Sequence, residues 1–134
     1  PAFLDTAYLY ALLNSRDEWH AAALFWQERL AGQRRPLVTT EFVLVEFADG
    51  LASLRFALGR ADDRRVAVEI VPASSDLFLR ALRLFEQRDD KGWGMTDCTS
   101  FAVMTERGLL DALTVDDHFR QAGFNPLMLA SPTT

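Results

Sequence analysis

The chain has 134 residues, and with 49% hydrophobic content this length predicts one globular domain over residues 1–134, with a disordered tail of a few residues. A net charge of −5 argues against a protein that grips nucleic acid through a broad basic surface, but less against a metal nuclease, whose ion would neutralise several acids. The single cysteine, Cys98, excludes an intrachain disulfide and fits a reducing cytoplasm, and neither a membrane span nor a signal peptide is evident.

The first half of the chain predicts strands that alternate with helices, because short apolar runs are followed by segments with helical spacing. The expected elements are a strand over residues 2–4, a helix over 6–13, a helix capped by Asp17 and ended by Gly32, a strand at 37–38, and a helix capped by Thr39 or Thr40 that runs to about Leu58.

The second half continues the alternation. The expected elements are a charged link over 59–65, a strand over 66–71 stopped by Pro72, a helix capped by Ser74 or Ser75, a loop over 89–94, a helix capped by Thr96, a strand over 113–115, a helix over 117–122 ended by Gly123, and a strand over 127–129. Strands joined to helices by short links predict an α/β sandwich around a mainly parallel sheet.

Two acids of the first half break their local patterns. Asp5 follows a strand and precedes a helix, which places it at the carboxyl edge of an open α/β sheet, where ligands bind; a helix N-cap is the alternative. Glu46 falls within the apolar stripe that carries Val43 and Phe47. A carboxylate directed at a core needs a partner or a cation, whereas an edge position would let Glu46 reach solvent or an Arg.

Two further acids lie at helix starts in the second half. Asp97 follows Thr96, where the helix dipole alone favours an acid, but the preceding Gly-Trp-Gly suits a close approach of backbone to a ligand. Asp116 and Asp117 follow a strand as a doublet, so that one can cap the helix while the other faces a site. We prefer Asp116 for the site, because it directly follows Val115. Acids gathered from these four places would repel one another and require a divalent cation, which indicates phosphate chemistry.

Taken together, four segments resemble the successive blocks of PIN-domain ribonucleases, and most closely those of the VapC toxins of bacterial toxin–antitoxin pairs and their solitary relatives. The segments are Phe3-Leu-Asp5-Thr6, Thr39-Thr-Glu-Phe-Val-Leu-Val-Glu46, Met95-Thr-Asp97-Cys-Thr-Ser-Phe-Ala-Val, and Leu113-Thr-Val-Asp116-Asp-His-Phe-Arg-Gln-Ala-Gly-Phe124. Their order and spacing are kept over nearly the whole chain, and the last two blocks are the most specific.

The resemblance implies a PIN-like three-layer α/β/α sandwich with a mainly parallel central sheet. It assigns the catalytic, metal-binding acids to Asp5, Glu46, Asp97 and Asp116, with Asp117, Thr6 and Thr96 as accessory positions. It also implies Mg²⁺ or Mn²⁺ as cofactor, RNA cut in single-stranded or loop regions, a cognate antitoxin, and a homodimer. The role of Glu46 stays open between a direct ligand, a ligand through water, and a group that orients the attacking water.

Loop cations and one aromatic side chain are candidates for substrate contact. These residues are Arg34, Arg35, Arg60, Arg64, Arg65, Lys91 and Trp93, of which Trp93 could stack on an unpaired base. We prefer the alternative, in which the cations are solvated and Trp93 half-covers the core. His20 and His118 are expected on helix surfaces, and Cys98 is expected to be a small buried hydrophobe.

Other classes of protein fit less well. A phospho-accepting receiver domain needs paired acids after its first strand and a late Lys, whereas the only Lys is Lys91. A haloacid-dehalogenase-type phosphatase needs a second Asp two positions after Asp5, where Ala7 stands. A non-catalytic binding module of the same fold and a housekeeping RNA-processing nuclease remain alternatives to the toxin.

Overall fold

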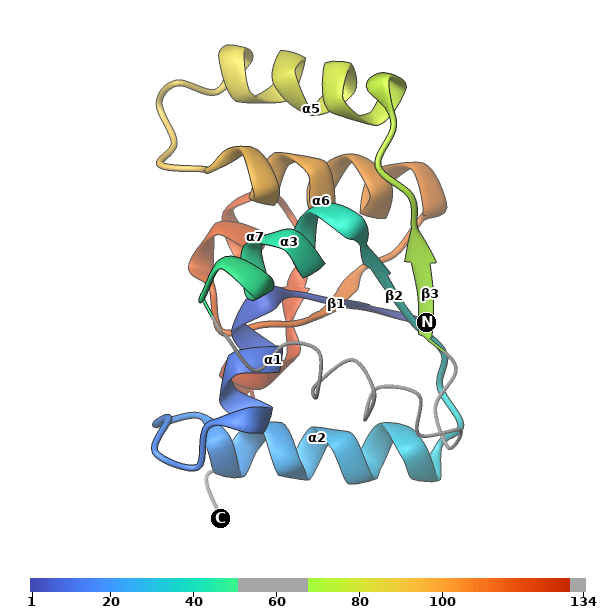
Figure 1. Ribbon diagram of the computed structural model, residues 1–134, viewed down its shortest axis with the longest axis vertical. Coiled ribbons are helices and arrows are strands. Elements are labelled where there is room, and N and C mark those ends of the chain that lie inside the picture. The colour runs from blue at the N-terminus through green and yellow to red at the C-terminus, as the bar shows by residue number, and fades with distance from the viewer. Residues whose placement is uncertain (51–67, 131–134) are drawn as a thin grey trace.

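Five parallel strands form the centre of the computed structural model, which describes residues 1–50 and 68–130 (Figure 1). The strands lie in the order β3-β2-β1-β4-β5, and each pairing between neighbours is parallel. Their bounds are Ala2–Leu4 for β1, Leu37–Thr40 for β2, Val68–Val71 for β3, Asp111–Leu113 for β4 and Asn125–Pro126 for β5. The predicted parallel α/β sheet is therefore confirmed.

Helices cover both faces of the sheet, as Figure 1 shows, with α5 and α6 on one side and α1 and α2 on the other. The helices of the described residues are α1 (Thr6–Leu13), α2 (His20–Gly32), α3 (Glu41–Gly50), α5 (Ser75–Gln87), α6 (Met95–Arg107), α7 (Asp117–Gln121) and a 3₁₀ turn, η1 (Leu127–Ala130). None of the helices in these ranges has the length and hydropathy of a membrane span.

Side chains that alternate between the two faces of the sheet explain why the core consists of two clusters, one on each face. Phe3, which pairs in register with Val38 and Ala112, packs toward α6, and these three residues belong to one buried cluster. Leu4 is next along β1 and points to the opposite face, where it shares a cluster with residues of α1 and α2, including Tyr8. Successive side chains of a strand point to opposite faces, so a central strand such as β1, which is apolar at every position, must be covered on both sides.

Three strands differ from their predicted bounds. The second strand, predicted at 37–38, continues to Thr40. The fourth strand spans Asp111–Leu113 instead of 113–115, and beyond its end the hydroxyl of Thr114 bonds to the side chain of Asp5 and to the backbone of Asp116. The predicted strand over 127–129 is wrong: β5 precedes it, and Leu127 begins the 3₁₀ turn. Leu127 and Met128 are both buried in the same cluster, which a tight turn permits and the alternation of a strand does not.

The predicted helix starts are confirmed in part. Thr40 caps α3, since its Oγ1 accepts from the backbone N–H of Val43 at 3.1 Å, and Ser74 caps α5. Asp17 instead closes a turn three residues before α2 begins. Thr96 is not a cap, because α6 already begins at Met95. The expected continuation of the third helix to Leu58, the link over 59–65, the start of the strand at 66–67 and the tail over 131–134 lie outside the described residues.

Candidate active site

Three of the four predicted acids meet at the carboxyl edge of the sheet. Asp5 directly follows β1, Asp116 follows the neighbouring strand β4, and Asp97 lies in the first turn of α6. The negative charges of Asp97 and Asp116 both act on the carboxyl group of Asp5 and raise its pKa. Residues separated by up to 111 positions are thus brought into one electrostatic site by the order of the strands.

Asp5 is the buried member of this site, with 5% of its surface exposed. Burial raises the pKa of Asp5 to about 7, and two hydrogen bonds, from the hydroxyl of Thr114 and from the backbone N–H of Thr6, oppose the rise. A buried carboxyl group with two like charges nearby is costly to ionise unless a cation compensates it. A cation beside Asp5 would therefore lower the cost of its charge.

Thr114 holds two of the acids in place, and the sequence pattern did not predict this role. Its Oγ1 donates to Oδ2 of Asp5 at 2.7 Å and accepts from the backbone N–H of Asp116 at 3.0 Å, and the residue is fully buried. The available signal was a hydroxyl residue in an otherwise apolar run, two positions before Asp116. Its hydroxyl uses both its donor and an acceptor lone pair, which fixes the spacing of the two acids.

Asp97 is fixed from both sides. Its Oδ2 accepts from the backbone N–H of Gly94 at 3.1 Å, which ties the carboxylate to the start of α6, and lies 2.9 Å from Nδ1 of His118. Partial burial raises the pKa of Asp97, and repulsion from Asp116 adds to this, while the bonds to His118 and Gly94 act in the opposite direction.

His118 belongs to the site, and the prediction that it is only a helix-surface residue is wrong. Besides Asp97, its Nδ1 lies 3.3 Å from Oδ1 of Asp116, and its side chain is half-buried. The signal that was available is its position two residues after Asp116, in the first turn of a helix that begins at the site. His20 lies on α2, where its Nδ1 is 2.7 Å from the carbonyl oxygen of Ala11.

The two neighbouring acids lie in different places, Asp116 at the site and Asp117 on the surface of α7. Asp116 caps α7 by accepting from the backbone N–H of His118 at 2.9 Å while its Oδ1 stays near the imidazole of that residue. Asp117 instead pairs with Arg120 and accepts from Nε2 of Gln121 at 3.2 Å. One residue, Asp116, therefore both caps the helix and faces the site.

Glu46 stands apart from the other acids. Its side chain is exposed on α3, so of the two positions that the sequence left open, the edge position is the one observed. Val43 and Phe47 of the same helix are buried, and Glu46 lies just beside their stripe. Partial burial raises the pKa of Tyr10, and the charges of Glu46 and Asp49 raise it further. Glu46 is not among the residues whose donor atoms cluster within the described part of the chain.

The donor atoms fit a divalent cation. Asp97, Asp116 and His118 each offer one ligand atom, and these atoms lie within 4.8 Å of one another, with the buried carboxyl of Asp5 adjoining them. Oδ donors of this kind suit Mg²⁺ and Mn²⁺.

The hydroxyl of Thr6 is buried beside Asp5 and has no hydrogen-bond partner among the described residues, so it is available to a water or ligand. Thr96 is half-buried, and its carbonyl accepts from Thr99 and Ser100.

The residues expected to contact substrate lie in different places. Arg35 pairs with Asp111 at the start of β4 and donates to the carbonyl of Pro1, so Arg35 and its neighbour Arg34 lie at the amino edge of the sheet, opposite the acids. Lys91 is half-buried in the loop between α5 and α6, and the adjacent Gly92 lies against His118. Arg60, Arg64 and Arg65 lie outside the described residues.

Trp93 is a core residue, which agrees with the preferred interpretation that it covers the core and not with the alternative that it stacks on a base. Only 6% of it is exposed. Its ring meets that of Phe101 edge-on at 5.0 Å between centroids, and its Nε1 donates to Oε1 of Gln121 at 3.1 Å. The guanidinium of Arg88 also lies 5.1 Å from the ring centroid. The ring and the Nε1 of Trp93 therefore both make contacts within the protein.

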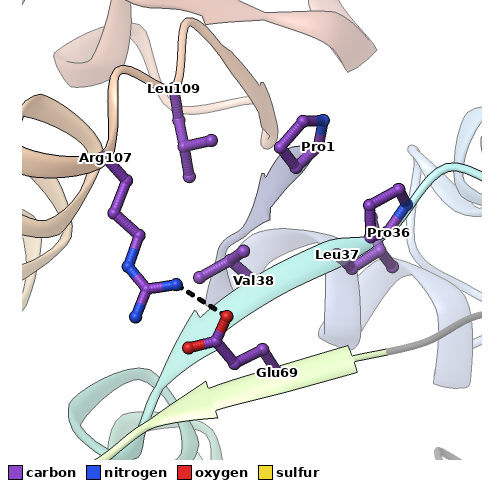
Figure 2. Close-up of a pocket in the computed structure, with 7 residues that line it drawn as sticks. All are labelled: Pro1, Pro36, Leu37, Val38, Glu69, Arg107 and Leu109. Atoms are coloured by element: carbon purple, nitrogen blue, oxygen red, sulfur yellow. Dashed lines mark hydrogen bonds and ion pairs between the residues drawn. The ribbon is translucent and has the colours of Figure 1, made fainter.

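A pocket of about 410 Å³ also opens at the amino edge of the sheet (Figure 2). Pro1, Pro36 and Leu109 line it together with the ion pair that Arg107 forms with Glu69 at 2.6 Å. The one acid of this lining is neutralised by its partner, so the pocket offers no free carboxylate to a cation.

Comparisons with known proteins agree with this geometry. The family model of the PIN domain matches residues 2–125. VapC20 of Mycobacterium tuberculosis, named a 23S rRNA-specific endonuclease in the strains CDC 1551/Oshkosh and ATCC 25618/H37Rv, is 32% identical over 127 residues, which cover 91% of this chain and 94% of the relative. The crystal structure of M. tuberculosis VapC20, described as a sarcin–ricin loop cleaving toxin, matches with a TM-score of 0.76 and 29% identity over 94% of this chain and 98% of that one.

Proposed function

This chain belongs to the PIN domain family, and we propose that it is a VapC-like, metal-dependent endoribonuclease, the toxin of a toxin–antitoxin pair. The observation that carries the proposal is the convergence of Asp5, Asp97 and Asp116 on one edge of the sheet, where burial and, to a smaller extent, the charges of the two outer acids raise the pKa of Asp5. Like charges held this close indicate a site that is completed by a cation.

Asp5, Asp97 and Asp116 would hold Mg²⁺ or Mn²⁺. When bound, such an ion supplies the Lewis acidity that makes water a nucleophile and offsets the charge that develops on a phosphodiester. The protein's own part is positional. Thr114 sets the spacing between Asp5 and Asp116, and the bond from Gly94 fixes Asp97 at the start of α6. The acids would act as ligands of the ion and take no nucleophilic role, since water supplies the nucleophile.

Glu46 and Thr6 would act at the rim and the floor of this site. Glu46 is exposed on α3 and free to orient a water, alone or as a ligand through water. The unpartnered hydroxyl of Thr6 lies beside Asp5 and can bond to a water that enters with the ion. Asp117 is held by Arg120 and Gln121 on the surface of α7, so we assign it at most a supporting charge.

We propose ribosomal RNA, cut in a loop, as the substrate class. Support comes from the relatives named for cleavage of 23S rRNA and of the sarcin–ricin loop, which this chain matches over nearly its whole length. The net charge of −5 means that few phosphates are contacted through cations, which favours recognition of a compact loop over a long duplex. Among the predicted substrate cations that the structure describes, Lys91 lies on the same side of the sheet as the acids.

An antitoxin protein and a second copy of the chain are the proposed partners, and the cytoplasm is the proposed location. Apolar side chains that are exposed on the helices support a partner surface, in particular Leu24 on α2 and Val45 on α3, which is 60% exposed. The buried free thiol of Cys98 is compatible with a reducing compartment.

Cleavage of RNA by the purified, antitoxin-free protein tests the proposal. A pool of sarcin–ricin loop RNA, other structured RNAs and single-stranded RNA is incubated with Mg²⁺, with Mn²⁺ and with EDTA. We expect metal-dependent cleavage that Asp97→Asn abolishes and that the matched surface variant Asp89→Asn retains, since Asp89 is exposed at the end of α5. Wild-type protein that is inert with both metals would favour a non-catalytic binding module.

A further inference from the structure

His118 stands where a ligand of the cation would stand. Its Nδ1 lies 2.9 Å from Oδ2 of Asp97 and 3.3 Å from Oδ1 of Asp116. Neighbouring ligands of an octahedral ion with bonds of about 2.1 Å are separated by about 3.0 Å, so these two separations, which are contacts within the metal-free protein, are also compatible with donors that share one ion. The three ligand atoms form the one compact set found in the described residues.

We propose that His118 is a nitrogen ligand of the active-site cation and that it biases the site toward Mn²⁺ over Mg²⁺; this deepens the proposed nuclease function and rests on it. The imidazole takes part as the neutral ring, bound through Nδ1 with its proton on Nε2. Mg²⁺ strongly prefers oxygen ligands, whereas the first-row transition ions also accept imidazole, so one nitrogen among carboxylates favours the transition ion.

The surroundings of His118 permit this switch of partner. Its backbone N–H is held by Asp116, which fixes the residue independently of its side chain. Its side chain is 31% exposed, so solvent can reach the ring and carry a proton between the two nitrogens. In the metal-free protein, Nδ1 forms a hydrogen bond with Oδ2 of Asp97 and lies near Oδ1 of Asp116. A bound cation would take the place of that hydrogen bond.

A different role would be purely structural, with His118 serving only as a hydrogen-bond donor to Asp97. Substitution by Gln separates the two roles. The amide N–H of Gln can still donate to Asp97, but an amide nitrogen does not coordinate a divalent ion. His118→Gln therefore retains the structural contact and removes the nitrogen ligand. His20→Gln is the matched control, because His20 is the only other histidine of the chain and lies on α2.

Pulsed electron paramagnetic resonance of Mn²⁺ bound to the untagged full chain is the test, because with two histidines any coordinated imidazole must be one of them. We expect ¹⁴N coupling from a directly bound imidazole in the wild type and in His20→Gln, and its loss in His118→Gln. Calorimetric titrations should show that His118→Gln weakens Mn²⁺ binding by about tenfold or more, a loss of the size seen when a supporting residue of a metal site is removed, with a smaller change for Mg²⁺.

Two outcomes would overturn the inference, and they differ from failure of the nuclease proposal. Mn²⁺ that binds the wild type without nitrogen coupling would exclude His118 as a ligand, and so would equal losses of Mn²⁺ and Mg²⁺ affinity in His118→Gln. In either case metal-dependent RNA cleavage could persist. Absence of both metal binding and cleavage in the wild type would instead refute the proposed function itself.

Discussion

Replacement of Asp5 by Asn should stabilise the metal-free protein at neutral and alkaline pH while it removes nuclease activity. Burial raises the pKa of Asp5 from 3.8 to about 7. Asn is close in size, and its side-chain oxygen can accept the same hydrogen bonds from Thr114 and Thr6, but it cannot ionise. The variant therefore removes a buried charge without removing the contacts that hold the side chain.

The magnitude follows from the two pKa values. Between pH 4 and pH 7 the folded protein keeps the Asp5 proton that the unfolded chain has released, so the free energy of unfolding decreases as the pH rises. Ionisation of a carboxyl group whose pKa moves from 3.8 to about 7 costs the fold about 4 kcal/mol. The stability attributable to protonated Asp5 is present below pH 4 and is lost as the pH passes through 7. Asn cannot ionise, so the stability of Asp5→Asn should not decrease in this way as the pH rises.

Urea unfolding in EDTA at several pH values between 4 and 8 measures this difference. Relative to wild type, Asp5→Asn should gain stability steadily over that range, by a few kcal/mol at pH 8. Asp89→Asn, an exposed control, should run parallel to wild type. Added Mg²⁺ should stabilise wild type more at pH 8 than at pH 5.5, because the ligand must be deprotonated, and should have little effect on Asp5→Asn. Parallel pH profiles for wild type and Asp5→Asn would refute the account of Asp5 as a buried, charge-repelled ligand.

Thr114→Val should destabilise the fold by about 1–3 kcal/mol and weaken metal binding, because Asp5 and the backbone N–H of Asp116 both lose a buried partner. Urea unfolding measures the change in stability and calorimetry the change in metal affinity, and unchanged values would show that the hydroxyl is dispensable. Trp93→Ala should cost about 3–5 kcal/mol of stability, since the ring is buried against Phe101; a stable variant that loses only RNA binding would restore the base-stacking role. Arg35→Ala should leave the cleavage rate of the folded enzyme unchanged, because Arg35 pairs with Asp111 at the far edge of the sheet, and a large loss would place RNA there.

Features that depend on local pattern were predictable from the sequence. Asp5 follows its strand directly, and parallel strands bring the residues that follow them to one edge, so the pattern of residues alone predicts its place at the site. The capping roles of Thr40 and Ser74 are likewise local and were among the residues expected. The family was also predictable, because the order and spacing of the four blocks are properties of the sequence.

Features that depend on contacts between distant segments were not predictable. The role of Thr114 comes from a bond to Asp5 across 109 residues, and that of His118 from a bond to Asp97 across 21 residues. The sequence left the position of Glu46 open between core and edge, because consecutive helix residues are about 100° apart and a small error in the direction of the apolar stripe moves a side chain from core to solvent. Trp93 lies in a loop whose burial is set by α6 and α7.

The paired variants Asp116→Asn and Asp117→Asn provide the most direct test that metal held at the sheet edge cuts RNA. Asn remains a good helix cap, so neither change should disrupt α7. With Mn²⁺ or Mg²⁺ and sarcin–ricin loop RNA, Asp116→Asn should lose cleavage, while Asp117→Asn, whose carboxylate pairs with Arg120 on the surface, should retain it. Retention of full activity by Asp116→Asn, or equal loss in both variants, would contradict the assignment of the site.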